Sequence, residues 1–289
     1  MSDSTHPCFH REAHGTFGRI HLPVAPECNI RCGFCDRRYA CANESRPGVA
    51  AALLTPEQAR NAFMAALEHH PRLRVAGIAG PGDPLANPWE TFATLELVRR
   101  AAPHVLLCLS CNGLALPGHA DTLASLGVGH VTVTVNAATP EVGARVYQRV
   151  HTPTGWLTGP EGAALLHARQ EEGIRRLRAL GVAVKVNTVV IPGVNDAEVP
   201  TIAREAAAWG VELMNCIPLI AVSGTPLGSC PAPTPALMHR LRAAAEAHVP
   251  QMRHCARCRA DALGLLGEGG IIPPHGGLAP YTEGRHAPR

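Results

Sequence analysis

The sequence predicts an α/β protein whose core is a partial TIM-like barrel of six β/α units. Short apolar runs that suit buried strands alternate with stretches that carry apolar residues at helical spacing. This alternation is typical of a parallel sheet with helical crossovers. Polar and cysteine residues gather directly after the strand-like runs, where barrels of this kind carry their functional groups. The length of 289 residues suits one barrel-sized unit.

The strands are predicted from six apolar runs, at 19–25, 74–79, 105–110, 130–135, 182–191 and 211–220. Helices are predicted from apolar residues spaced three and four apart, at 55–69, 90–101, 140–150, 162–180, 197–209 and 234–248. The first helix opens with Thr55 and Pro56, an N-cap residue followed by proline in the first turn.

The barrel is expected to span 19–250, and two segments fall outside its repeat. Residues 1–18 form an N-terminal arm that carries a cysteine, and residues 251–268 form a C-terminal segment that carries two. The remaining stretch, 269–289, is rich in glycine and proline and is expected to be a flexible tail.

Composition excludes several classes of protein. A formal net charge of +3 is too small to indicate a nucleic-acid partner, and no apolar run is long enough for a membrane span. The polar, histidine-rich start is unlike a secretory signal. The 11 cysteines are therefore expected to be reduced ligands or core residues of a cytoplasmic protein.

Cys28, Cys32 and Cys35 follow the first predicted strand with the spacing Cys-x3-Cys-x2-Cys. Three thiolates on a four-iron cluster leave one iron open for chemistry, whereas Cys41 as a fourth ligand could close a zinc site. The spacing, its place after a first strand and the aromatic Phe34 resemble the signature of radical S-adenosylmethionine (SAM) enzymes, whose fold is a six-stranded partial barrel. This resemblance favours the open cluster and implies that it binds SAM.

The stretch GPGDP, residues 80–84, follows the second predicted strand. It resembles the glycine-rich element that receives the SAM amino group in this superfamily, although an ordinary turn is the alternative. Glycine lets backbone carbonyls approach the ligand, and an acidic side chain can accept from the ammonium. The predicted SAM-binding residues are Phe34, Gly82, Asp83, Asn112, Thr134, Asn136, Asn187 and Ile191.

Side-chain alternation places polar groups of the later strands inside the barrel. Thr132, Thr134 and Asn136 share one face of the fourth strand, and Lys185 shares a face with Asn187. These groups suit the ribose and carboxylate of SAM. The alternative is that they only hydrogen-bond one another.

Cys255 and Cys258 form a second paired-cysteine motif, and such pairs in a reducing compartment are usually metal ligands. Two thiolates do not complete a metal site, so partners must come from elsewhere in the chain. The candidates are Cys8 in the N-terminal arm, His21 on the first strand and Cys108 on the third.

Alternation along the third strand separates its two cysteines. Cys108 shares a face with Ser110 and Asn112 and is expected to point into the barrel. Cys111 lies on the opposite face and is expected to be a core thiol.

Several longer stretches together resemble the NifB family of nitrogenase cofactor maturases. They include HPCFHREAH, GRIHLPVAPECNIRCGFCDRRYACANESRPGV, VKVNTVVIPGVND and RHCARCRADALGLLGE. The resemblance extends from Cys8 to Glu268, with one departure at Cys111, where the family usually carries threonine. Many family members have a further C-terminal carrier domain, and this chain is expected to be a stand-alone core form without it.

The resemblance implies an enzyme that fuses two [4Fe-4S] clusters with a SAM-derived carbide and a ninth sulfur. The product would be an [8Fe-9S-C] precursor of the nitrogenase cofactor. A third [4Fe-4S] cluster, on the Cys-x3-Cys-x2-Cys loop, would bind SAM. The substrate clusters would be held by Cys8, His21 and Cys108, and by Cys255 and Cys258 with a further ligand that the sequence leaves open. Implied partners are iron–sulfur cluster donors, product carrier or scaffold proteins and an electron donor such as a ferredoxin.

His21 is also the candidate catalytic residue. A neutral imidazole exchanges more readily than a thiolate, and once released it can act as a base near neutral pH. We therefore hypothesise that His21 anchors a substrate cluster and helps to deprotonate the carbide precursor.

Two other functions fit the same motifs. The first is a radical SAM enzyme with auxiliary clusters that modifies a peptide or a small molecule. The second is a zinc-binding structural protein. Cys41 likewise has two interpretations, as a plain buried thiol or as a ligand that completes a substrate cluster.

Overall fold

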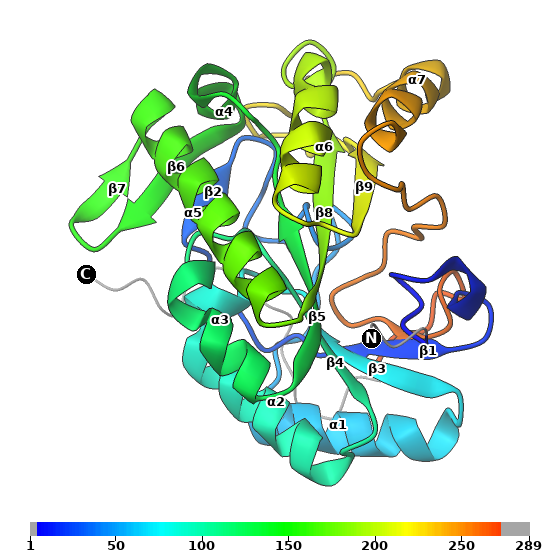
Figure 1. Ribbon diagram of the computed structural model, residues 1–289. Coiled ribbons are helices and arrows are strands. Elements are labelled where there is room, and N and C mark those ends of the chain that lie inside the picture. Colours follow the sequence, from blue (N-terminus) through cyan, green and yellow to red (C-terminus); the bar gives the residue numbers. More distant parts are fainter. Residues whose placement is uncertain (1–4, 273–289) are drawn as a thin grey trace.

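A computed structural model describes residues 5–272 and shows a curled seven-stranded sheet (Figure 1). The strand order is β10-β1-β3-β4-β5-β8-β9, and all neighbours run parallel except β10, which pairs antiparallel with β1. The strands are β1 (Gly18–His21), β3 (Leu73–Ile78), β4 (Leu106–Cys111), β5 (Val128–Thr134), β8 (Ala183–Val190), β9 (Leu213–Pro218) and β10 (Leu263–Gly264). The six parallel strands coincide with the six predicted ones, so the predicted α/β partial barrel is confirmed.

Helices connect the parallel strands and lie along the outer side of the sheet (Figure 1). They are α1 (Pro56–His69), α2 (Pro88–Ala101), α3 (Leu116–Ser125), α4 (Pro140–Val146), α5 (Gly159–Ala179), α6 (Val199–Ala208) and α7 (Pro235–Glu246). Short 3-10 turns are η1 (Arg11–Ala13), η2 (Pro84–Ala86) and η3 (Asp196–Glu198). The predicted N-cap of α1 is present: the Thr55 side chain accepts from the Gln58 N–H in a full capping box.

Two helical regions differ from the prediction, and four short strands were not predicted. Helix α3 was not predicted, because proline and glycine near its start give it weak helix propensity. The helix predicted at 140–150 ends at Val146, where the chain turns into β6 (Tyr147–Thr152). This strand pairs with β2 (Ile30–Cys32) and β7 (Gly155–Leu157) in a small separate sheet. Pairing with a strand more than a hundred residues away overrides the local helical pattern. The strands that were not predicted are β2, β6, β7 and β10.

The inner face of the sheet carries polar and sulfur-bearing side chains in rows across the strands. His21 lies in register with Gly77, which lies in register with Cys108. Ser110, Thr132 and Lys185 form the same kind of row on β4, β5 and β8. The predicted inward face is therefore confirmed for Cys108, and Cys111 is buried in the main hydrophobic core as predicted.

The N-terminal arm and the C-terminal segment lie together beside β1 (Figure 1). A His254 ring nitrogen is 3.0 Å from the Pro7 carbonyl oxygen, and the His254 ring contacts the His14 ring edge to face. The two ends of the described chain thus meet at the open side of the sheet. Most of the predicted tail, residues 273–289, lies outside the described residues.

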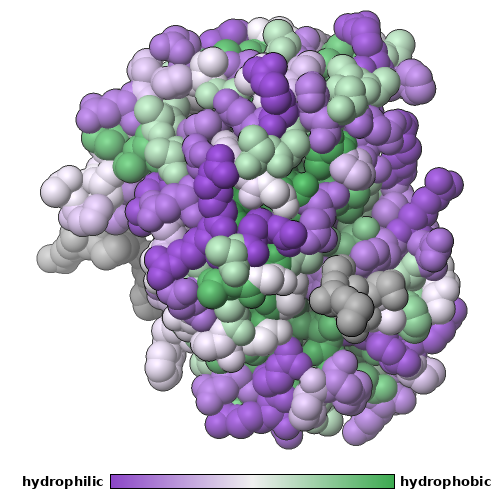
Figure 2. Space-filling model, viewed as in Figure 1, coloured by the Kyte–Doolittle hydropathy of each residue, from purple (hydrophilic) through white to green (hydrophobic). Residues whose placement is uncertain are grey.

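Hydrophilic side chains cover much of the periphery of the face in Figure 2, and hydrophobic ones show between them toward its middle. Within residues 5–272, every helix is too short or too polar to cross a membrane.

Candidate functional site

The three cysteines of the Cys-x3-Cys-x2-Cys loop line one small, largely enclosed cavity. Two amides face their sulfurs: Asn43 Nδ2 lies 3.5 Å from Cys32 Sγ, and Asn112 Nδ2 lies 3.9 Å from Cys28 Sγ. Burial raises the pKa of Cys28 to about 11, so its thiolate needs a cationic partner. Three sulfurs that line one cavity, two of them with an amide donor nearby, fit an iron–sulfur cluster, which is larger than a single ion, bound through three thiolates. Cys41 lines the same cavity.

The predicted glycine-rich element holds this loop in place. A Cβ at Gly82 would lie 2.0 Å from the Glu27 carbonyl oxygen, so only glycine allows the two backbones to meet. The next amide, of Asp83, donates to the same carbonyl at 2.7 Å. The Asp83 carboxylate accepts from the Asn112 and Leu85 amides, at 2.6 Å and 2.9 Å, and burial raises its pKa to about 6. Gly82 and Asp83 therefore join the cysteine loop to the ends of the neighbouring strands.

The predicted SAM-binding side chains fall into three groups. Asp83 and Asn112 line the small cavity, and Asn187 lines a larger one next to it. Thr134 donates to Glu44, and Asn136 donates to Asn43 at 3.0 Å, so both support residues that line the cavities. Phe34 and Ile191 are buried in the apolar cluster beneath the loop, and neither lines a cavity.

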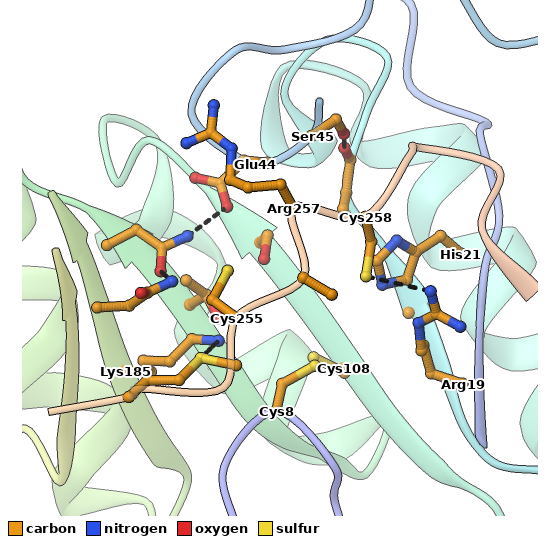
Figure 3. A pocket seen from close by; sticks show the side chains of 18 of the residues that line it. Cys8, Arg19, His21, Glu44, Ser45, Cys108, Lys185, Cys255, Arg257 and Cys258 are labelled. Atoms are coloured by element: carbon orange, nitrogen blue, oxygen red, sulfur yellow. Dashed lines mark hydrogen bonds between the residues drawn. The ribbon is translucent and has the colours of Figure 1, made fainter. Parts of the chain in front are cut away.

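The larger cavity is where the remaining candidate ligands meet (Figure 3). Three separate parts of the chain contribute them: the N-terminal arm, strands β1 and β4, and the C-terminal segment. The candidates lining it are Cys8, His21, Cys108, Cys255 and Cys258. The structure thus brings together five residues that the sequence spreads over 250 positions.

Within this cavity the thiols stand close enough to influence one another. Burial raises the pKa of Cys8 to about 11 and that of Cys108 to about 12. Cys258 and Cys255 raise the Cys8 pKa further, and Cys8 raises that of Cys108. An Arg19 guanidinium nitrogen lies 3.1 Å from Cys258 Sγ. Buried neutral thiols with cations nearby are the expected state of ligands that ionise when they bind metal.

His21 is oriented as a neutral ligand. Its Nδ1 is 3.0 Å from the Arg259 carbonyl oxygen and so carries the proton, which leaves Nε2 with its lone pair. Burial and the neighbouring Arg19 lower the His21 pKa to about 4. The lowered pKa favours metal binding by the neutral ring. It also makes the free imidazole a weaker base than the hypothesis of a catalytic base requires.

Glu44 and Asn43 are among the residues that sequence reasoning did not assign to a site, and they line both cavities. Burial raises the pKa of Glu44 to about 7, against the hydrogen bond from Thr134 and the charge of Lys185. The only signal in the sequence was the spacing of Glu44 from Cys41. Among residues 5–272, no three Cys, His, Asp or Glu side chains converge closely enough to hold a single metal ion.

The curled parallel sheet and the three-cysteine loop at its first strand define a radical SAM protein, and comparison with known families agrees. The radical SAM superfamily model matches residues 22–206, and the chain belongs to this superfamily. The zinc-binding structural alternative is therefore wrong.

Within the superfamily, the chain is similar to proteins named FeMo cofactor biosynthesis protein NifB. It is 48% identical to the one from Herbaspirillum seropedicae, over 91% of this chain and 51% of that protein. It is 44% identical to the one from Chlorobaculum tepidum, over 93% of this chain and 63% of that protein. It is 48% identical to the one from Klebsiella pneumoniae, over 92% of this chain and 58% of that protein. The resemblance to NifB seen in the motifs is confirmed, and the chain spans about half to two thirds of these relatives' length.

Solved structures show the same fold at low identity. Methylornithine synthase (PylB) aligns with a TM-score of 0.54 at 15% identity, covering 92% of this chain and 75% of that one. The FeFe-hydrogenase maturase HydG from Carboxydothermus hydrogenoformans aligns with a TM-score of 0.52 at 16% identity, covering 83% of this chain and 55% of that one. Both support the radical SAM barrel.

Proposed function

We propose that this protein is the radical SAM enzyme that builds the [8Fe-9S-C] precursor of the nitrogenase cofactor from two [4Fe-4S] substrate clusters, a SAM-derived carbon and a ninth sulfur. The supporting observation is that Cys8, His21, Cys108, Cys255 and Cys258 line one cavity beside the cysteine loop. Fusion of two clusters requires both to sit in one enclosed space near the site of SAM cleavage. The similarity to NifB proteins over more than nine tenths of this chain supports the same reaction.

The small cavity is the proposed SAM site, with Cys28, Cys32 and Cys35 as ligands of a resident [4Fe-4S] cluster. When bound, that cluster supplies the electron that cleaves SAM at its open iron. The chain's own part is to enclose the site and to hold the loop in place through Gly82 and Asp83. Asn112 Nδ2, near Cys28, can also hydrogen-bond a bound cluster.

The larger cavity is the proposed substrate site, and its incomplete ligand set suits the reaction. Cys8, His21 and Cys108 would hold one substrate cluster, and Cys255 with Cys258 would hold the other. Clusters with fewer than four protein ligands keep irons that can exchange partners, which fusion requires. His21 would bind through Nε2, because Nδ1 is held by the Arg259 carbonyl.

Two molecules of SAM account for the carbon. The first transfers its methyl group to a substrate sulfide and leaves as S-adenosylhomocysteine. The second gives a 5′-deoxyadenosyl radical that removes one hydrogen atom from that methyl group. Breaking of the new C–S bond and loss of the two remaining protons, with electrons supplied by the irons of the substrate clusters, then leave carbide. Iron–sulfur cluster donors, a product carrier or scaffold and an electron donor such as a ferredoxin are the proposed partners.

Anaerobic purification followed by iron counting and SAM product analysis tests this function. The proposal predicts about 12 irons per chain, which is three four-iron clusters. It also predicts both S-adenosylhomocysteine and 5′-deoxyadenosine, in equal amounts. Formation of 5′-deoxyadenosine alone would contradict it and favour a radical SAM enzyme that modifies a peptide or a small molecule.

A further inference from the structure

Lys185 places a positive charge inside the larger cavity without a charged partner. Its side chain comes from the fully buried strand β8, is 6% exposed and lines the cavity (Figure 3). The ammonium contacts the Met252 thioether sulfur at 3.9 Å and lies 5.2 Å from the centroid of the Phe9 ring. Within residues 5–272, no ion pair joins it to a carboxylate.

A buried ammonium is costly unless an anion compensates it. Glu44 is the sole acidic side chain among the described residues that line this cavity. Its carboxylate oxygens accept hydrogen bonds from Thr134 and Asn187 instead, and the charge of Lys185 reaches it only over a longer range. The arrangement therefore leaves the ammonium to be neutralised by a ligand of the cavity.

The charge of Lys185 acts on the thiols of Cys8 and Cys108. In both cases it lowers the thiol pKa, against the effect of burial. Phe9, whose ring lies near the ammonium, directly follows Cys8 in the arm. The cation thus lines the same cavity as the two sulfurs that the N-terminal arm and strand β4 contribute, and it is near enough to influence both.

His6 presents a second donor to the same place. Its Nδ1 accepts the Cys8 backbone N–H at 3.1 Å, so the neutral ring carries its proton on Nε2. His6 is 1% exposed, lines the cavity, and its Nε2 is buried without a hydrogen-bond partner. The ring packs edge to face on Phe9, with centroids 4.8 Å apart, which fixes its direction.

We propose that Lys185 and His6 are positioning residues that donate hydrogen bonds to the sulfides of the substrate cluster held by Cys8. This inference rests on the proposed function, because it requires an iron–sulfur substrate in the larger cavity. A four-iron cluster on thiolates is anionic, and donors to its sulfides stabilise the reduced form and raise its reduction potential. Lys185 supplies charge as well as a hydrogen bond, and His6 supplies a hydrogen bond alone.

Lys185→Met in the fully loaded, anaerobically purified protein tests the proposal, because methionine keeps the length of the side chain without its charge. The midpoint potential of the substrate cluster, followed by EPR during a redox titration, is expected to fall. If the variant lowers the equilibrium constant for one-electron reduction of the cluster tenfold, its midpoint potential falls by about 59 mV. Iron loss to a chelator is expected to become severalfold faster. Lys185→Arg should restore much of the potential.

Two further variants separate the roles. His6→Phe keeps an aromatic ring in the arm and removes the donor, so a smaller fall in the same potential is expected. Met252→Leu removes the thioether contact and keeps the ammonium, and the potential should stay unchanged. The SAM cluster is the internal control, because its cavity does not include Lys185 or His6. Its EPR response to added SAM should be the same in every variant.

The inference would be overturned if the reduction potential and the rate of iron loss to the chelator were unchanged in both Lys185→Met and His6→Phe. In that case, a wild-type protein with three clusters would leave the proposed function standing. Equal loss of all clusters, including the SAM cluster, would also overturn it, because the residues would then act on the fold. A wild-type protein with the SAM cluster alone would overturn the proposed function and this inference together.

Discussion

His21 and Cys108 lie in one row across the sheet, with Gly77 between them. Register pairs His21 with Gly77 on β3, and Gly77 with Cys108 on β4. Adjacent strands are about 4.8 Å apart, so the backbones of His21 and Cys108 are separated by about 10 Å. The absence of a side chain at Gly77 leaves the space above the middle strand open, and the imidazole and the thiol can face one ligand across it.

Filling that space should displace the substrate cluster. A Cβ at Gly77 would lie 3.5 Å from the His21 ring and 3.7 Å from Cys108 Cβ, which are ordinary contacts. Gly77→Ala should therefore be tolerated, whereas the two further methyl groups of Gly77→Val would enter the gap. We expect Gly77→Val to lose about four irons per chain, the content of one cluster, and to keep SAM binding. Full iron content in Gly77→Val would show that the row does not hold a cluster.

His21→Ala tests both roles suggested for the imidazole. Loss of the Nε2 ligand is expected to lower iron content by up to about four per chain and to slow carbide insertion at least tenfold. His104→Ala, at an exposed histidine, is the control and should behave as wild type. Carbide insertion at the normal rate in His21→Ala would remove both roles.

Gly82→Ala should disrupt the SAM site through its backbone. The new Cβ would lie 2.0 Å from the Glu27 carbonyl oxygen, and neither backbone can yield without moving the cysteine loop. We expect the free energy of unfolding to fall by about 1–3 kcal/mol or more and SAM-cluster occupancy to fall with it. Gly118→Ala is the matched control, since nothing lies within 4 Å of its Cβ position in α3. Anaerobic urea titration with iron analysis measures both effects.

Cys41 lines the small cavity, the proposed SAM site, and it does not line the larger one. Burial holds the pKa of its thiol well above the ordinary value, so the thiol is neutral. Cys41→Ser should keep all three clusters and bind SAM at least as tightly as wild type, because a competing sulfur is removed. Equilibrium binding of SAM and iron counting check this. A loss of about four irons would instead make Cys41 a required ligand.

Glu44 should make stability depend on pH in the cluster-free protein. Its pKa is raised from 4.5 in the unfolded chain to about 7 in the folded one. Between these values the unfolded state releases a proton that the folded state keeps, so the free energy of unfolding falls as pH rises. The loss should total about 3 kcal/mol and level off above pH 7. Glu44→Gln should flatten this slope in anaerobic denaturant titrations at pH 5 and pH 8, and an unchanged slope would assign it to another group.

The parallel strands could be predicted from sequence because each is a short apolar run bounded by polar residues, and burial on both faces imposes that pattern locally. Strand β6 could not, because Tyr147–Thr152 is a strand only by pairing with Ile30–Cys32. The inward direction of Cys108 and Lys185 also followed from alternation along a strand. What these side chains face could not be predicted, since it depends on where the chain ends fold.

The sequence by itself determined the candidate ligands of this protein: three thiols at a spacing suited to an open cluster, and further thiols and a histidine of the kinds that bind metal. It did so because ligand type and loop spacing are local properties. The tertiary structure alone decided that Cys8, His21, Cys108, Cys255 and Cys258 share one cavity, and that Lys185, His6 and Glu44 belong to its wall. Sheet curvature and the docking of the two chain ends create that space, and both arise from contacts between residues far apart in the chain.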